Sequence, residues 1–197
     1  MQAGSAMIAA MTDRVPQPRL RQLATTDLDV RELEEIRALL DEAFGDDEDE
    51  RFTEDDWRHA LGGAHFVLDL DGEIVAHASV VPRELHVGGR PVRTGYVEAV
   101  ATLPARQGQG IGSIVMEAVG DWIRDRYELG ALGTGRHSFY ERLGWRRWRG
   151  PSAVRTASGE HPTPEEDGYI LVLVTASSPV LDIDAPIACD WRPGDVW

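Results

Sequence analysis

The stretch Gln107-Gly108-Gln109-Gly110-Ile111-Gly112 decides the fold, because it lies between a strand-like apolar run and an amphipathic helix. The run before it, residues 96–103, predicts a central strand that ends at Pro104. Apolar residues at helical spacing follow it, namely Ile111, Ile114, Val115, Ala118, Val119, Trp122 and Ile123. Glycines allow close backbone approach and helix-start amides attract anions, so the segment predicts a pyrophosphate site that needs no lysine.

Two other interpretations of these glycines remain open. A dinucleotide-binding loop is one, although the spacing is not Gly-x-Gly-x-x-Gly, the segment follows four strands, and no acidic ribose partner is evident. A glycine-rich helix start without any ligand is the other.

Patterns on both sides of this segment predict one α/β (α+β) domain. The elements expected before it are a strand over 19–23, a helix capped by Thr25-Thr26-Asp27 and ending at Gly45, a short helix from Thr53 to Gly62-Gly63, and strands 65–70 and 73–81 joined by an Asp71-Gly72 turn. The elements expected after it are a parallel strand over 129–132, a helix over 137–143, and strands over 145–149 and 169–174. We therefore expect a mixed, mostly antiparallel sheet with helices on both faces, a single domain over 18–197, and a flexible lead-in over 1–17.

Composition excludes several classes of chemistry. The 197 residues include no Lys and no Asn, which excludes pyridoxal-phosphate and Schiff-base lysines, Walker-type loops and N-glycosylation. The formal net charge of −14 disfavours nucleic acid and suits a small cationic partner. Cys189 is the single cysteine and no signal peptide or membrane span is evident, so we expect a cytoplasmic protein without a membrane partner. The six histidines show no metal-ligand spacing, so no metal is expected.

Gln107-x-x-Gly110-x-Gly112 resembles the acyl-coenzyme A signature of the GCN5-related N-acetyltransferases (GNAT), in the expected place between strand and helix. Nearly the whole chain resembles the aminoglycoside 2'-N-acetyltransferases within that superfamily. The segments that carry this closer match are residues 53–57, 61–63, 95–101, 129–132 and 189–197.

The resemblance implies a GNAT fold and acetyl-CoA as cosubstrate. It implies that backbone groups of Val100 and Thr102 hold the pantetheine arm and that the amides of the signature hold the pyrophosphate. The signature residues are Gln107, Gly108, Gln109, Gly110, Ile111 and Gly112. An amine would then attack the thioester directly, with the Val100 amide as the oxyanion donor.

Two residues are candidates for proton transfer. Glu98 lies in an otherwise apolar strand, where a carboxylate is costly, and we interpret it as a base acting through water, with a structural ion pair as the alternative. Tyr140 matches the tyrosine general acid of the family. Its alternative is a core tyrosine with a satisfied hydroxyl.

The resemblance also implies an acceptor site rich in anions. Its candidate residues are Asp56, Glu98, Ala99, Thr134, Glu166, Asp167, Asp195 and the terminal carboxylate of Trp197. Asp56 could instead be a helix-start charge and Trp197 could serve packing alone. Two departures from the family pattern lie near this side: an acidic insertion over 46–51, and a segment over 132–136 shorter than the serine-rich equivalent of the family.

The predicted function is acetylation of the 2'-amine of aminoglycosides, which confers resistance, by an enzyme that the family suggests is a homodimer. One alternative is acetylation of another amine, such as a polyamine or a cell-envelope precursor. A non-catalytic acyl-CoA-binding module is the second alternative.

Overall fold

A computed structural model describes residues 18–45 and 51–197; the expected lead-in over 1–17 and the acidic run over 46–50 lie outside these residues. The strands are β1 (Pro18–Ala24), β2 (Ala64–Leu70), β3 (Glu73–Val87), β4 (Arg90–Thr102), β5 (Leu129–Gly133), β6 (Arg146–Arg147), β7 (Ser152–Thr156), β8 (Gly159–Pro162), β9 (Ile170–Val174) and β10 (Ile187–Asp190). The helices are α1 (Val30–Phe44), α2 (Glu54–Ala60), α3 (Ile111–Arg126) and α4 (His137–Glu141), with short 3-10 turns η1 (Thr25–Asp27), η2 (Pro104–Arg106) and η3 (Pro164–Glu166).

The strands form one mixed sheet in the order β6-β9-β5-β4-β3-β10-β7-β8, and β2 joins β1 to β3. β3 pairs with β2 along its first half and with β10 near its end. β4–β5 and β10–β7 are parallel, and the other pairs among the described residues are antiparallel. The predicted mixed, mostly antiparallel sheet is therefore confirmed.

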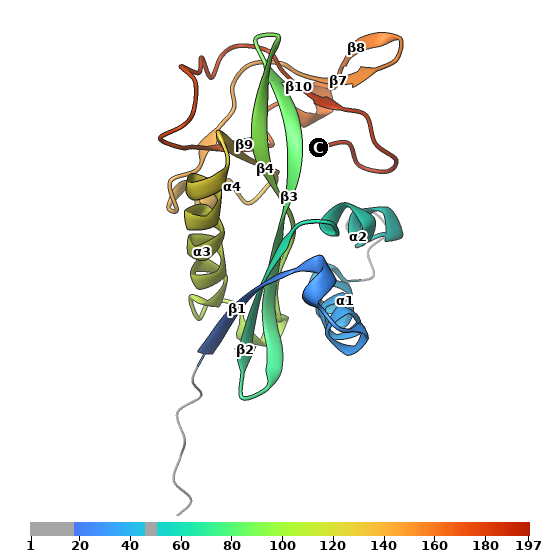
Figure 1. The fold of residues 1–197 in the computed structure, drawn as a ribbon, viewed down its shortest axis with the longest axis vertical. Helices are drawn as coiled ribbons and strands as arrows, with labels where there is room; N and C mark the ends of the chain where they lie inside the picture. The colour runs from blue at the N-terminus through green and yellow to red at the C-terminus, as the bar shows by residue number, and fades with distance from the viewer. Residues whose placement is uncertain (1–17, 46–50) are drawn as a thin grey trace, which may run out of the picture.

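Helices cover the two faces of this sheet, with α3 on one side of β3 and β4 and with α1 and α2 on the other (Figure 1). The α3 stripe, including Val115, Val119 and Ile123, is buried against β2–β5. Ile36 and Leu40 of α1 pack on the opposite face with Val67 and Ile74. The helical periodicity thus predicted most of the residues that face the sheet, although Ile114 of the predicted stripe is 40% exposed.

The start of α1 differs from the expectation. Thr25–Asp27 form η1 instead of capping the helix. Asp29 is the N-cap, and it forms a capping box in which its side chain accepts from the Glu32 amide while the Glu32 carboxylate accepts from the Asp29 amide. The Asp71-Gly72 turn is confirmed, since both residues have positive φ, at 52° and 90°.

Three strands in the last third of the chain, β7, β8 and β10, were not predicted, and β6 is shorter than the strand expected over 145–149. β10 has only four residues and is held between β3 and β7, so its partners are distant in sequence. Periodicity within so short a segment carries little signal. Among the described residues, no helix is both long and apolar enough to span a membrane.

Candidate active site

A β-bulge interrupts β4 at the centre of the sheet. His77 pairs with Ala101 and Ser79 with Glu98, so Ala99 and Val100 together oppose the single residue Ala78. Ala99 has a φ of 51°, in the left-handed region that residues with a Cβ rarely adopt. Such a bulge re-aims the neighbouring groups, here the side chain of Glu98 and the amide of Val100.

β4 and β5 diverge just before the bulge. Their parallel pairing ends at Tyr96 and Ala131, after which β5 pairs only with β9 and β4 only with β3 among the described strands. The edge of β4 that faces β5 therefore keeps main-chain groups free for a ligand. Val97 and Leu132, from the two strands, belong to the same buried cluster as Tyr140 of α4, so this cluster lies beside the divergence.

The glycine segment lies at the open end of this divergence and leads into α3. Gly108 and Gly110 have φ of 74° and 82°, and Gly110 is the N-cap of α3 without a side-chain cap. The first amides of an α-helix have no partner within the helix and attract anions. The side-chain Nε2 of Gln107 donates to the Thr102 carbonyl at 3.2 Å, which ties the loop to the end of β4.

The residues present fit a pantetheine-pyrophosphate ligand. A Cβ on Gly112 would lie 3.2 Å from Thr102 Oγ1 and 3.5 Å from the Phe139 ring, so glycine permits α3 to start close to β4. The free edge of β4 leads to the start of α3, where Thr102 lies beside Gly112. The assignment of Val100 and Thr102 to the cofactor stays a prediction.

Glu98 is buried in an ion pair with Arg192. The Arg192 Nη1 donates to Glu98 Oε1 at 2.6 Å, and the two side chains are only 15% and 14% exposed. Burial raises the pKa of Glu98, while the Arg192 charge opposes this rise. The ion pair that we considered as an alternative is thus present, and the role of Glu98 as a base stays a prediction.

Tyr140 is buried in α4, where burial raises its pKa to about 12. Its ring packs edge-on against Phe139, at 4.9 Å between centroids, and against Trp145, at 6.2 Å. The phenol is therefore protonated at neutral pH, and its role as the general acid stays a prediction.

Residues after β10 fold back over the face of the sheet that carries Glu98; we call residues 191–197 the C-terminal strap. In Figure 1 the strap and α2 lie on the same side of β3. His59 Nε2 of α2 contacts the Pro193 carbonyl at 2.8 Å, and a Cβ on Gly194 would lie 2.7 Å from the Cβ of Asp55. Because of its positive φ and this close approach, Gly194 lets the strap seat on α2.

Arg192 organises the strap around Glu98. Its Nε donates to the Asp195 carbonyl at 2.8 Å, and its Nη2 lies 3.5 Å from the Trp197 carbonyl. Trp197 is buried, donates from Nε1 to Thr163 Oγ1 at 3.1 Å, and lies close to Gly133. The fold thus brings Glu98, from the middle of the sequence, together with Asp195 and Trp197 near its end.

The remaining candidates have more varied surroundings. The Glu166 amide donates to the Thr163 carbonyl at 2.9 Å, and Thr163 Oγ1 accepts from Trp197, so Glu166 lies near the end of the strap. Burial first and then the Asp195 charge raise the pKa of Glu166. The Asp56 Oδ2 accepts from the amide and hydroxyl of Thr53 in a capping box, which supports the helix-start interpretation. The Asp167 Oδ1 accepts from the amide and hydroxyl of Ser152.

The last two candidates are Thr134, which lies beside the strap, and Ala99, whose carbonyl is engaged by a histidine. The Thr134 hydroxyl accepts from the Arg136 amide at 3.0 Å, and Thr134 follows Gly133, which lies against Trp197. The Ala99 carbonyl accepts from His77 Nδ1 at 2.8 Å.

Sequence reasoning missed three features around this site. Arg192 was part of a quoted motif but received no role. The guanidinium carbon of Arg83 lies 4.5 Å from the centre of the Tyr96 ring, and its Nη2 donates to the Val196 carbonyl. His65 and His77, which were given no role, form a buried hydrogen-bonded pair. The only sequence signal for Arg192 was its positive charge within the segment 189–197, which carries part of the family match.

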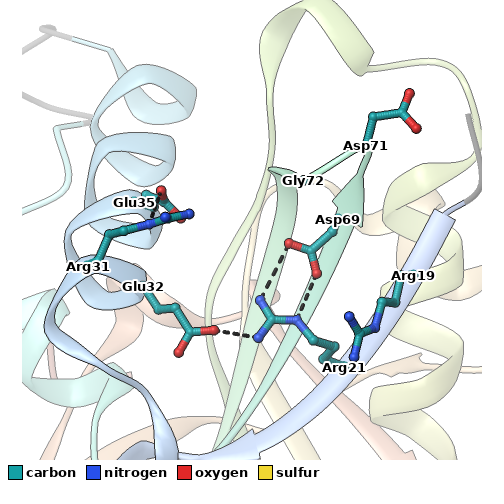
Figure 2. A pocket seen from close by; sticks show the side chains of 8 residues that line it. All are labelled: Arg19, Arg21, Arg31, Glu32, Glu35, Asp69, Asp71 and Gly72. Carbon is teal, nitrogen blue, oxygen red and sulfur yellow. Dashed lines mark hydrogen bonds and ion pairs between the residues drawn. The ribbon is translucent and has the colours of Figure 1, made fainter.

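A groove of about 660 Å³ lies elsewhere, between α1 and the β1–β2 pair. Figure 2 shows Arg21 between Asp69 and Glu32, and Arg31 beside Glu35. These opposite charges satisfy one another, and neither β4 nor α3 lines the groove. Among residues 18–45 and 51–197, no three His, Cys, Asp or Glu side chains cluster as metal ligands.

Comparison with known proteins gives the class. Residues 25–148 match the family model described as an acetyltransferase (GNAT) domain, and the chain belongs to this family of acetyltransferases. Within it, the chain is 42% identical over 182 residues to the aminoglycoside 2'-N-acetyltransferase of Mycolicibacterium fortuitum, a match that covers 90% of this chain and 91% of that protein. Both levels of the resemblance seen in the motifs are therefore confirmed.

Solved structures share the fold. A GNAT family N-acetyltransferase from Escherichia coli, in complex with CoA, has a TM-score of 0.64 and 16% identity, covering 90% of this chain and 92% of that one. A GCN5-related N-acetyltransferase from Kribbella flavida has a TM-score of 0.56 and 24% identity over 69% of this chain. This chain spans 34% of the length of the Kribbella protein. The expected GNAT fold is thus confirmed.

Proposed function

We propose that this acetyltransferase transfers the acetyl group of acetyl-CoA to the 2'-amino group of aminoglycosides, and so confers resistance to them. The observation that carries the proposal is the contact of Arg192 with both Glu98 and the Asp195 carbonyl, which brings two acidic residues together beside the β4 bulge. A polycationic acceptor needs such carboxylates at its ammonium groups. The name of the Mycolicibacterium fortuitum relative supports the same acceptor.

Acetyl-CoA supplies an acetyl group activated as a thioester. Main-chain groups of Val100 and Thr102 would hold its pantetheine arm, and the amides from Gln107 to Gly112 would hold its pyrophosphate. The CoA in the related Escherichia coli structure supports this assignment. The Val100 amide would stabilise the negative charge that develops on the acetyl oxygen.

Glu98 and Tyr140 would manage the protons. An ammonium group cannot attack, so Glu98, with its raised pKa, would accept a proton from the acceptor through water. Tyr140 would donate its phenolic proton to the departing sulfur, since burial keeps the phenol protonated. The acceptor nitrogen then gains the acetyl group and loses its second proton, which restores the Tyr140 phenol, and CoA leaves as the free thiol.

Arg192 would yield part of its contact with Glu98 when a cationic acceptor binds. The guanidinium neutralises the carboxylate in the free protein, and an ammonium group could take over that role. Asp56, Ala99, Thr134, Asp167 and Trp197 would line the acceptor side, with main-chain groups contributing where side chains are already engaged. We also propose a homodimer in the cytoplasm, which light scattering on the purified protein and cell fractionation would test.

The test is thiol release from acetyl-CoA with kanamycin B and kanamycin A, which differ only in an amine or a hydroxyl at the 2' position. We expect release with kanamycin B alone. Equal release with both would place the acetyl group on another amine. No release with either, despite measured acetyl-CoA binding, would contradict the proposed acceptor and favour another amine or a binding role.

A further inference from the structure

Two histidines that the proposed reaction does not use lie fully buried behind the β4 bulge. His65 of β2 and His77 of β3 are both 0% exposed. His65 Nδ1 lies 2.9 Å from His77 Nε2, and His77 Nδ1 lies 2.8 Å from the Ala99 carbonyl oxygen. On the other side, His65 Nε2 lies 2.8 Å from Thr25 Oγ1, which accepts from the Gly62 amide at 2.9 Å.

The end of this chain of contacts fixes the direction of every hydrogen bond in it. The Ala99 carbonyl has no proton, so His77 Nδ1 must be the donor. A neutral imidazole has one N–H, so His77 Nε2 accepts from His65 Nδ1–H. His65 Nε2 then accepts from the Thr25 hydroxyl. All bonds point toward Ala99, and bonds aligned in this way strengthen one another.

Both rings are neutral at physiological pH. Burial lowers the pKa of His65 to about 4 and that of His77 to about 3. Protonating His77 at Nε2 would place its N–H against the Nδ1–H of His65, so the arrangement that orders the chain also excludes the charged form of His77.

We infer that His65 and His77 are positioning residues, which hold the Ala99 carbonyl and so fix the β4 bulge between Glu98 and Val100. Ala99 adopts a left-handed φ that is unfavourable for alanine and persists only where its surroundings impose it. The inference rests on the proposed function for the roles of Glu98 and Val100, which flank Ala99. The carbonyl contact itself is independent of that function.

Asn and Leu at position 77 form a matched pair. Their side chains have the same branched shape, and both remove the contact to His65, but an Asn Nδ2 occupies the place of His77 Nδ1 and can still donate to Ala99. We expect His77→Leu to lower kcat about tenfold and His77→Asn to stay much closer to the parent, since small displacements at a reacting centre are costly. Equal losses of kcat in both variants would show a purely structural role and overturn the inference.

Two readouts do not depend on the acceptor. Hydrogen exchange of the amides over residues 97–102 should accelerate in His77→Leu and remain slow in His77→Asn. Nitrogen NMR of the parent should show both rings protonated at Nδ1 alone. Protonation of His77 at Nε2 would overturn the inference even if no variant folds. If the parent fails to acetylate aminoglycosides, the proposed function fails while these two measurements still decide the inference.

Discussion

Burial raises the pKa of Glu98, and the guanidinium of Arg192 opposes this rise more strongly than that of Arg83. Arg192→Gln removes a cation that lowers the pKa of Glu98, so that pKa rises further above its ordinary value. Since a base must be ionised, the acidic limb of the pH profile of kcat/KM should move to higher pH. Arg192→Lys keeps the charge and should leave the limb near that of the parent. Equal limbs in the Gln and Lys variants would contradict this account of Glu98.

Glu98→Gln and Tyr140→Phe test the proton-transfer roles directly. Each should lower kcat about a hundredfold or more, because general acid–base catalysis contributes on that scale. The dissociation constant of acetyl-CoA, measured by calorimetry, should stay nearly unchanged in both variants. Unchanged turnover in both would remove the assigned roles.

Single residues also show where sequence reasoning ends. Glu98 stood out as a carboxylate in an apolar strand, but its ion pair with Arg192 joins residues 94 positions apart and no local pattern predicts it. His65 and His77 were missed because a regular two-residue hairpin would place them on opposite faces. An irregularity between Leu68 and Asp69 shifts the register by one and brings both onto one face.

Among the secondary-structure elements, the start of α3 is the one that the cofactor assignment depends on. Gly112→Ala should weaken acetyl-CoA binding, since its Cβ would lie 3.2 Å from Thr102 Oγ1 and fill the space between α3 and β4. Gly120→Ala is the matched control on the same helix: its Cβ would meet only the flexible end of Arg124 at 3.2 Å and the Leu173 side chain at 3.6 Å. Calorimetric titration with CoA should separate the two variants, and equal affinities would contradict the assignment.

Elements with strong local patterns were predictable, and those held by distant partners were not. The α3 stripe and the Asp71-Gly72 turn follow from helical periodicity and from turn chemistry. β7 and β10 are short and pair in parallel, so no hairpin signal links them. The β4 bulge was equally invisible, because an alanine with positive φ has no sequence signature.

For the whole molecule, the buried histidine pair predicts sensitivity to acid. Both histidines titrate near 6.5 when unfolded and near 4 and 3 when folded, so the unfolded chain binds more protons as the pH falls below 6.5. Each should therefore remove about 1.4 kcal/mol of stability per pH unit between about pH 6 and its folded pKa. The raised pKa of Glu98 acts in the opposite sense above pH 4.5.

Urea unfolding between pH 7 and 4.5 measures this slope. The double variant His65→Leu/His77→Leu should lose stability less steeply than the parent, while Leu at the exposed His161 serves as the control. Parallel slopes in the parent and the double variant would show that the pair is not the source of acid sensitivity.

Over the whole chain, the net charge of −14 indicated a cationic partner without locating it. The location depends on the C-terminal strap, which returns across the sheet and places Arg192 against both Glu98 and the Asp195 carbonyl. The strap lies within the segment 189–197, whose resemblance to the family marked it as important. Its path over α2 depends on contacts such as that of Gly194 with Asp55, which only the folded chain shows.

The most direct test of the central claim is to locate the acetyl group on the product formed from kanamycin B, which offers several amines. Two-dimensional NMR of the purified product assigns the acetylated nitrogen without reference to any variant. The carboxylates beside the β4 bulge, taken with the Mycolicibacterium fortuitum relative, predict a single product acetylated at the 2' nitrogen. Acetyl groups at another nitrogen, or spread over several, would contradict the account of how this site selects and orients its acceptor.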